Sequence, residues 1–397
     1  MALSSLMTRF NEPETLKMAK LGRELRAQGH DITDLSLGEP DFDTPEHIKA
    51  AARKAIDDNY SHYTPVSGYL DVRQAVCEKL LRDNGLTYTP DQIVVSTGAK
   101  QSIANTVLAL VDAGEEVVIP TPYWVTYSEI VRLAGGVPNM VRTSMESGFK
   151  ITPAQLENAI NDNTKLFMFS SPSNPTGAVY TKDELAALVK VFEKHPQVYI
   201  MSDEIYEHII FDGRHESIAQ FESVKDRVII INGLSKGFAM TGWRLGYIAA
   251  PAEVAKAADK LQGQFTSATC SITQRAAIVA LTGDLKPTKD MVEEFKRRRL
   301  KILGLISGVP GMVCSEPPGA FYVFPDVHAF FGKKTPAGEV IADADALCMY
   351  LLNDAHVSTV SGKAFGEPNC IRISFANSVE KIEKGFGKIK KALEGLT

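Results

Sequence analysis

Short, almost uninterrupted runs of Val, Ile, Leu and Phe recur along the middle of the chain, at 93–96, 116–120, 166–169, 198–201, 228–231 and 245–248. Such runs are typical of strands covered on both faces, as in a mostly parallel sheet, because a strand with one wet face alternates apolar and polar residues. Helical patterns lie between several of the runs; the pattern over 182–194, for example, follows Thr181, a good N-cap residue. The sequence therefore predicts a doubly wound α/β core of about seven strands.

The pattern changes near residue 289, and from there strand and helix segments are mixed. A long amphipathic helix is predicted over 291–306, and a last helix over 379–393. We expect an N-terminal arm with part of a small domain (1–45), a large domain (46–288) and a small α+β domain (289–397). The run Arg297–Arg299 is expected to form a solvated helix face.

Composition excludes several classes of protein. With 44% hydrophobic and 23% charged residues the chain can bury a large core, and its formal net charge of −5 gives no reason to favour nucleic acid or an anionic membrane. The five cysteines are scattered without a CxxC pair, which favours a reducing compartment over disulfides or a zinc site. No metal-like grouping of histidines appears, so no metal site is expected. No run is long enough for a membrane span or a secretory signal, and a cytoplasmic location is expected.

Polar side chains follow several of the predicted strands, where ligands of parallel sheets bind. A turn of small residues opens a helix at 96–101, a Pro/Gly-rich turn covers 170–177, and Asp203 ends a buried strand. Lys236 and Arg244 stand in an otherwise apolar and small-residue segment. Each has a plain structural explanation, such as a helix N-cap for Asp203, and neither GxGxxG nor GxxxxGK[ST] occurs.

Together these features match the needs of pyridoxal phosphate. Its aldehyde needs a lysine amine for a Schiff base, and its pyridine nitrogen needs a carboxylate that keeps it protonated. Its phosphate suits helix N–H groups, hydroxyls and a cation.

Three strings strengthen this interpretation: Ser-Pro-Ser-Asn-Pro-Thr-Gly at 171–177, Ser-Asp-Glu-Ile-Tyr at 202–206 and Ser-Lys-Gly-Phe-Ala-Met-Thr-Gly-Trp-Arg at 235–244. They resemble the class I aminotransferases of pyridoxal-phosphate fold type I, most of all the bacterial aspartate aminotransferases of the Ib subgroup. The resemblance extends from Leu-Gly-Glu-Pro-Asp-Phe at 37–42 to Ile-Arg-Ile-Ser-Phe at 371–375. It implies a large domain with a mostly parallel seven-stranded sheet and a smaller α+β domain. The implied activity moves the amino group of L-aspartate to 2-oxoglutarate by a ping-pong mechanism.

The resemblance also implies roles for matching positions around the cofactor. Lys236 would form the Schiff base and move the proton, Asp203 would pair with the ring nitrogen, and Tyr206 would hydrogen-bond the ring 3′ oxygen. The remaining implied contacts are Asn174 to the same oxygen, Trp124 stacked on the ring, Gly98, Ala99, Ser235 and Arg244 around the phosphate, and Lys100 beside them. Tyr63 would reach the phosphate of a neighbouring subunit, so a homodimer with shared active sites is expected.

For the substrate, the resemblance implies that Arg372 binds the α-carboxylate, assisted by Gly38 and Asn174, with Trp124 nearby. Lys100 would bind the distal carboxylate, although a solvated first-turn lysine is the alternative, and Thr15 lies on the segment that folds over the substrate. Some members of the subgroup accept prephenate through a basic residue at the N-terminal position that holds Asn11 here, with Arg9 nearby. The alternative functions on the same fold are an aromatic or alanine aminotransferase, a C–S lyase, or a transcription regulator that binds the cofactor.

Overall fold

A computed structural model describes residues 3–12 and 14–397; the side chain of Thr15 also lies outside this description. Its largest element is a seven-stranded sheet with the order β2 (Ile93–Ser96), β8 (Gly246–Ala249), β7 (Val228–Gly233), β6 (Tyr199–Asp203), β5 (Thr164–Ser170), β3 (Glu116–Thr121) and β4 (Val137–Arg142). All neighbours pair in parallel except β8, which is antiparallel to both β2 and β7. This is the predicted mostly parallel sheet of the pyridoxal-phosphate fold type I.

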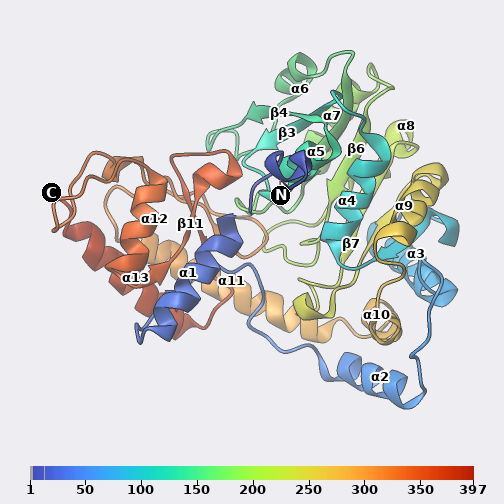
Figure 1. Cartoon of the computed structure of the whole chain (residues 1–397), viewed down its shortest axis with the longest axis horizontal. Helices are drawn as coiled ribbons and strands as arrows, with labels where there is room; N and C mark the ends of the chain where they lie inside the picture. The colour runs from blue at the N-terminus through green and yellow to red at the C-terminus, as the bar shows by residue number, and fades with distance from the viewer. Residues whose placement is uncertain (1–2, 13) are drawn as a thin grey trace.

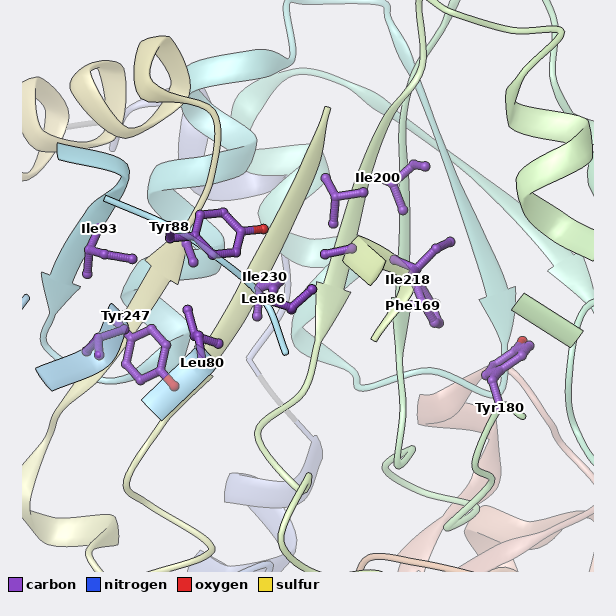
Figure 2. Close-up of a cluster of buried hydrophobic side chains, with 14 of the residues drawn as sticks. Leu80, Leu86, Tyr88, Ile93, Phe169, Tyr180, Ile200, Ile218, Ile230 and Tyr247 are labelled. Carbon is purple, nitrogen blue, oxygen red and sulfur yellow. The ribbon is translucent and has the colours of Figure 1, made fainter. Parts of the chain in front are cut away.

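Helices cover both faces of this sheet (Figure 1). Alternate strand residues face opposite cores because side chains alternate along a strand. Ile93, Ile200 and Ile230 belong to one core, part of which Figure 2 shows. That core includes residues of α2 (Glu46–Asp57), α3 (Leu70–Asn84), α6 (Pro153–Ala159), α7 (Lys182–Phe192), α8 (Glu222–Lys225) and α10 (Ser271–Thr282). Val94 and Ile229 face the other core, with α4 (Ala99–Leu110), α5 (Thr126–Ala134) and α9 (Ala252–Phe265).

A separate hydrophobic core joins the two ends of the chain. It contains residues of α1 (Glu14–Ala27), α11 (Lys286–Ser307), α12 (Ala344–Asn353) and α13 (Val379–Glu394). Strand β1 (Thr33–Asp34) pairs in parallel with β10 (Val357–Ser358), while β11 (Val360–Ser361), β12 (Ile371–Ser374) and β9 (Tyr322–Val323) form an antiparallel sheet. These elements lie together on one side of the molecule in Figure 1. The three domain boundaries stay a prediction.

The arginine run on α11 is not a solvated face, and that expectation is wrong. Only Arg297 is exposed. Arg298 is buried between Asp41, at 2.6 Å, and Glu294, at 2.8 Å, and Arg299, 2% exposed, pairs with Asp212 and with Glu316 at 3.2 Å. Buried arginines need such partners because an unpaired charge is costly away from water.

No helix in the described part of the chain combines the length and the apolar character that a membrane crossing requires. The five cysteines are all free thiols.

Candidate active site

A cavity of about 330 Å³ opens where the carboxyl ends of the parallel strands meet the core that joins the chain ends. Its walls come from segments that follow β1, β2, β3, β5, β6 and β7, and from β9 and β12. This is the edge at which doubly wound sheets bind ligands. Both N-terminal and C-terminal residues close the cavity, since Gly38 and Arg372 lie in its wall.

One end of the cavity is suited to an anion. Helix α4 begins at Ala99, and its N-cap residue Gly98 supplies no side-chain cap to the first turn. Arg244 lies beside it: a Cβ at Gly98, whose φ is +84°, would stand 2.5 Å from the Arg244 Nη2 atom. Arg244 itself has a φ of 54°, an uncommon conformation for a residue with a side chain. Helix N–H groups and a guanidinium, with Ser235 in the same wall, form a typical phosphate-binding donor set.

A buried carboxylate lies at the end of β6. Asp203 is 4% exposed; its Oδ2 accepts a hydrogen bond from the Tyr127 hydroxyl at 2.7 Å, and its Oδ1 accepts one from the Ile205 N–H at 3.2 Å. Burial raises the pKa of Asp203 to about 6, although both hydrogen bonds act in the opposite direction. Asp203 does not cap a helix, so the N-cap alternative does not apply.

A half-buried lysine faces the same cavity from the turn after β7. Lys236 donates a hydrogen bond to the Gly38 carbonyl, and its Nζ lies 5.8 Å from the centre of the Tyr206 ring. Burial lowers the pKa of Lys236 to about 8, and the positive charges of Arg372 and Arg244 act in the same direction. A substantial fraction of this amine is therefore neutral, and nucleophilic, near physiological pH.

A second guanidinium is enclosed at the opposite wall. Arg372 is 2% exposed and lies between the rings of Tyr322 and Phe365, 4.6 Å and 5.0 Å from their centres. It donates to Asn174 Oδ1 at 3.0 Å and to the Ser36 carbonyl. Among the described residues its Nε has no hydrogen-bond partner. A carboxylate that entered the cavity would meet a flat guanidinium with an unused donor.

Three aromatic side chains and a further lysine complete the wall. The hydroxyl groups of Tyr206 and Tyr322 lie 2.7 Å apart, and burial raises the pKa of both. Trp124 lines the cavity, and the Nζ of Lys100 lies 5.0 Å from the centre of its ring. Lys100 stays accessible to solvent; partial desolvation, and then the charge of Arg244, lower its pKa.

The structure brings most of the predicted site residues together. Those that line the cavity are Gly38, Ala99, Lys100, Trp124, Asn174, Asp203, Tyr206, Ser235, Lys236, Arg244 and Arg372, with Gly98 adjacent. Tyr63 lies elsewhere, on the surface, and is 99% exposed. Thr15 is the predicted residue whose side chain lies outside the description, although Leu16 lines the cavity.

Sequence reasoning missed Tyr127 and Tyr322. Tyr127 lies at the start of α5, three residues after Trp124, and this closeness in sequence to a predicted site residue was the available signal. Tyr322 stands in a short strand remote in the chain, and only the three-dimensional contact reveals it.

Comparisons with known proteins agree with this geometry. The model of the family "Aminotransferase class I and II" matches residues 30–389. The aspartate/prephenate aminotransferase of Cereibacter sphaeroides is 46% identical over 100% of this chain and 99% of its own length. A bifunctional aspartate aminotransferase and glutamate/aspartate-prephenate aminotransferase of Petunia hybrida is 42% identical over 99% of this chain and 83% of its own.

Solved structures are similar along the whole chain. The aspartate aminotransferase of Rhizobium meliloti has a TM-score of 0.97 at 40% identity, with 100% of both chains covered. The Thermus thermophilus aspartate aminotransferase with maleate has a TM-score of 0.92 at 37% identity, covering 99% of this chain and 100% of the other. This chain therefore belongs to the class I and II aminotransferase family.

Proposed function

We propose that this protein is a pyridoxal-phosphate-dependent aspartate aminotransferase that moves the amino group of L-aspartate to 2-oxoglutarate in two half-reactions. One observation carries the proposal: the half-buried amine of Lys236 and the buried carboxylate of Asp203 face one cavity that ends at an uncapped helix N-terminus. The names of the relatives from C. sphaeroides and R. meliloti support the choice of aspartate.

The residues present fit the cofactor. The hydrogen bonds to Asp203 come from neutral donors, the Tyr127 hydroxyl and the Ile205 N–H, and a protonated ring nitrogen would supply a cationic one. The first turn of α4, Ser235 and Arg244 would hold the phosphate, Asn174 and Tyr206 the 3′ oxygen, and Trp124 the ring face. When bound, pyridoxal phosphate supplies an aldehyde for the amino group and a ring that takes up electrons from the reacting carbon.

The side chains of this chain would then bind the substrate and move its proton. Arg372 would hold the α-carboxylate through its guanidinium edge, which Tyr322 and Phe365 already fix in orientation. Lys236 would hold a proton at Nζ and carry it to and from the substrate, since a pKa of about 8 permits both protonation states. Enclosure between the two cores would exclude water from the reacting groups.

Dicarboxylate selectivity is proposed to come from Lys100. Its ammonium lies in the cavity wall beside Trp124, and the T. thermophilus structure named above was solved with maleate, itself a dicarboxylate. We expect Lys100→Ala to raise KM for aspartate but not for alanine, and Lys190→Ala, at an exposed position of α7, to change neither. An equal effect of Lys100→Ala on both substrates would contradict this assignment.

A homodimer with shared active sites is also proposed. Tyr63 is almost fully exposed in the isolated chain and lies in a shallow surface depression with Thr64 and Cys270. A second copy that covers this surface would receive Tyr63 at its own phosphate end. Sedimentation should give a dimer, and Tyr63→Phe should weaken cofactor binding in that dimer.

The visible spectrum of the purified protein tests the cofactor and the substrate together. We expect an absorbance band that bleaches with L-aspartate or L-glutamate and returns with 2-oxoglutarate. Lys236→Ala should abolish turnover. A band that aspartate leaves unchanged would refute the assignment of aspartate as substrate. The lack of any band after addition of pyridoxal phosphate would refute the assignment of the cofactor.

Prephenate is the second candidate substrate, because the relatives from C. sphaeroides and P. hybrida carry it in their names. Asn11 lies in a neighbouring cavity of about 370 Å³, with Lys17 and Lys363, and its backbone N–H donates to Glu129 at 2.7 Å. An assay with aspartate as donor and prephenate as acceptor decides whether the activity is present.

A further inference from the structure

The hydroxyl of Tyr127 is the side-chain donor that reaches Asp203. Tyr127 is 1% exposed, and its 2.7 Å hydrogen bond to Oδ2 complements the Ile205 N–H that reaches Oδ1. Each carboxylate oxygen therefore accepts a hydrogen bond from the protein. Two fixed donors on different elements, the start of α5 and the turn after β6, prevent rotation of the carboxylate.

The position of Tyr127 is itself rigid. Its ring packs edge-on against Trp124, with 5.8 Å between ring centres, and lies in the hydrophobic core that α5 shares with the sheet. Ser170, at the end of β5, pairs with Asp203 across the sheet and lines the same cavity. Packing against Trp124 and the core thus directs the phenol hydroxyl toward Asp203.

A carboxylate in this position has little other electrostatic support. The charged groups that act on it are Glu204, which disfavours its ionised form, and Lys236, which favours it. Burial acts against ionisation, and the Tyr127 hydrogen bond is the first influence that opposes burial. A protonated Asp203 would offer a cationic ring nitrogen no negative charge, so the ionised form is the one that forms a charge-assisted pair with it.

We propose that Tyr127 is a positioning residue, which keeps Asp203 ionised and aimed at the ring nitrogen of pyridoxal phosphate through the hydrogen bond between its hydroxyl and Oδ2. This inference rests on the proposed function, because it assigns a partner to the carboxylate of that site. It adds a residue that acts through Asp203, and Tyr127 at the start of α5 also contacts Trp124, which precedes the helix.

The test uses the noncovalent affinity for pyridoxamine 5′-phosphate, which has no aldehyde and reports only hydrogen bonds, charge and stacking. The variant is Tyr127→Phe, which removes one oxygen atom. The matched control is Tyr123→Phe, because the Tyr123 hydroxyl donates to Ser128 at 3.1 Å and not to Asp203. Thermal melts of both variants verify that they fold.

Loss of a hydrogen bond to a charged group should raise the dissociation constant of the Tyr127→Phe protein by roughly 10- to 100-fold. The control should change it less than about twofold. An analogue in which a ring C–H replaces the nitrogen should show no difference between wild type and Tyr127→Phe. In an Asp203→Ala background, Tyr127→Phe should have no further effect, as a double-mutant cycle requires for residues that act together.

The outcomes separate this inference from the proposed function. If the wild-type protein fails to bind pyridoxamine 5′-phosphate, the proposed function fails and this inference with it. If the wild type binds and Tyr127→Phe binds equally well, only the role of Tyr127 is overturned. An equal loss for the analogue and for pyridoxamine 5′-phosphate, or a loss that persists without Asp203, would also overturn it and indicate a purely structural residue.

Discussion

Replacing Asp203 by asparagine should stabilise the cofactor-free protein at neutral and alkaline pH. In the native chain Asp203 is 4% exposed. Burial raises the pKa of its carboxyl group from the ordinary value of 3.8 to about 6. The difference, at about 1.4 kcal/mol for each pH unit, corresponds to a destabilisation of about 3 kcal/mol when the group is ionised. Asparagine removes the charge, and its amide can still accept from the Ile205 N–H and donate to the Tyr127 oxygen.

The sign of the pH dependence follows from proton linkage. Between pH about 4 and about 6 the folded state binds more protons at Asp203 than the unfolded state, so the wild-type protein loses stability as the pH rises through this window. Above about pH 6 this loss of wild-type stability is complete and no longer changes with pH. The advantage of Asp203→Asn should therefore be about 3 kcal/mol near pH 8 and about half of that near pH 5.

Urea denaturation of cofactor-free wild type and Asp203→Asn, at equal protein concentration, measures this advantage. Asp162→Asn is the matched control because Asp162 is exposed, and it should have no effect beyond about 0.5 kcal/mol. A wild-type protein as stable as Asp203→Asn near pH 8, or an advantage that does not grow with pH, would refute the reasoning. The same substitution should weaken binding of pyridoxamine 5′-phosphate, so stability and cofactor affinity change in opposite directions.

Three further predictions concern other buried charges. Burial lowers the pKa of Lys236 to about 8, so labelling of its amine by a small aldehyde in the cofactor-free protein should rise with pH through about 8 and then level off. Peptide mass spectrometry can follow this labelling. A midpoint near the ordinary pKa of 10.5 would contradict an effect of burial on this amine. Arg372→Lys removes the flat guanidinium that lies between Tyr322 and Phe365. The KM for aspartate should therefore rise roughly 10- to 100-fold, with a smaller change in kcat. An unchanged KM would show that Arg372 does not bind the substrate carboxylate. Lys79→Met leaves the buried Glu207 carboxylate without its lysine partner and should lower the free energy of unfolding, measured in urea, by about 3–5 kcal/mol. The double variant Lys79→Met/Glu207→Leu should recover most of this stability. A double variant as unstable as Lys79→Met would argue against the ion pair.

The elements that sequence predicts best are those whose own residues determine them. Strands covered on both faces need continuous apolar runs, and six such runs correspond to strands of the sheet. The seventh strand, β4, was missed because it is a half-exposed edge strand that contains Pro138 and so lacks that pattern.

Features that depend on remote partners could not be predicted in the same way. A run of three arginines stays exposed to solvent unless carboxylates pair with it. The carboxylates that pair with Arg298 and Arg299 belong to distant segments of the chain, at Asp41 and Asp212. The candidate site was predicted from motifs that follow the strands, which explains why Lys236 was found and Tyr322, on a small strand of another sheet, was not.

The pairing of the two chain ends also has a consequence for biosynthesis. β1 pairs with β10, and Arg372 donates to the carbonyl of Ser36, a residue 336 positions earlier in the chain. Contacts of such long sequence separation form late, because a large loop must close before they stabilise anything. During translation residues 33–36 must therefore wait for these partners until almost the entire polypeptide has left the ribosome. A nascent chain that is shorter than about 372 residues should lack a complete carboxylate-binding wall, although its sheet is already present.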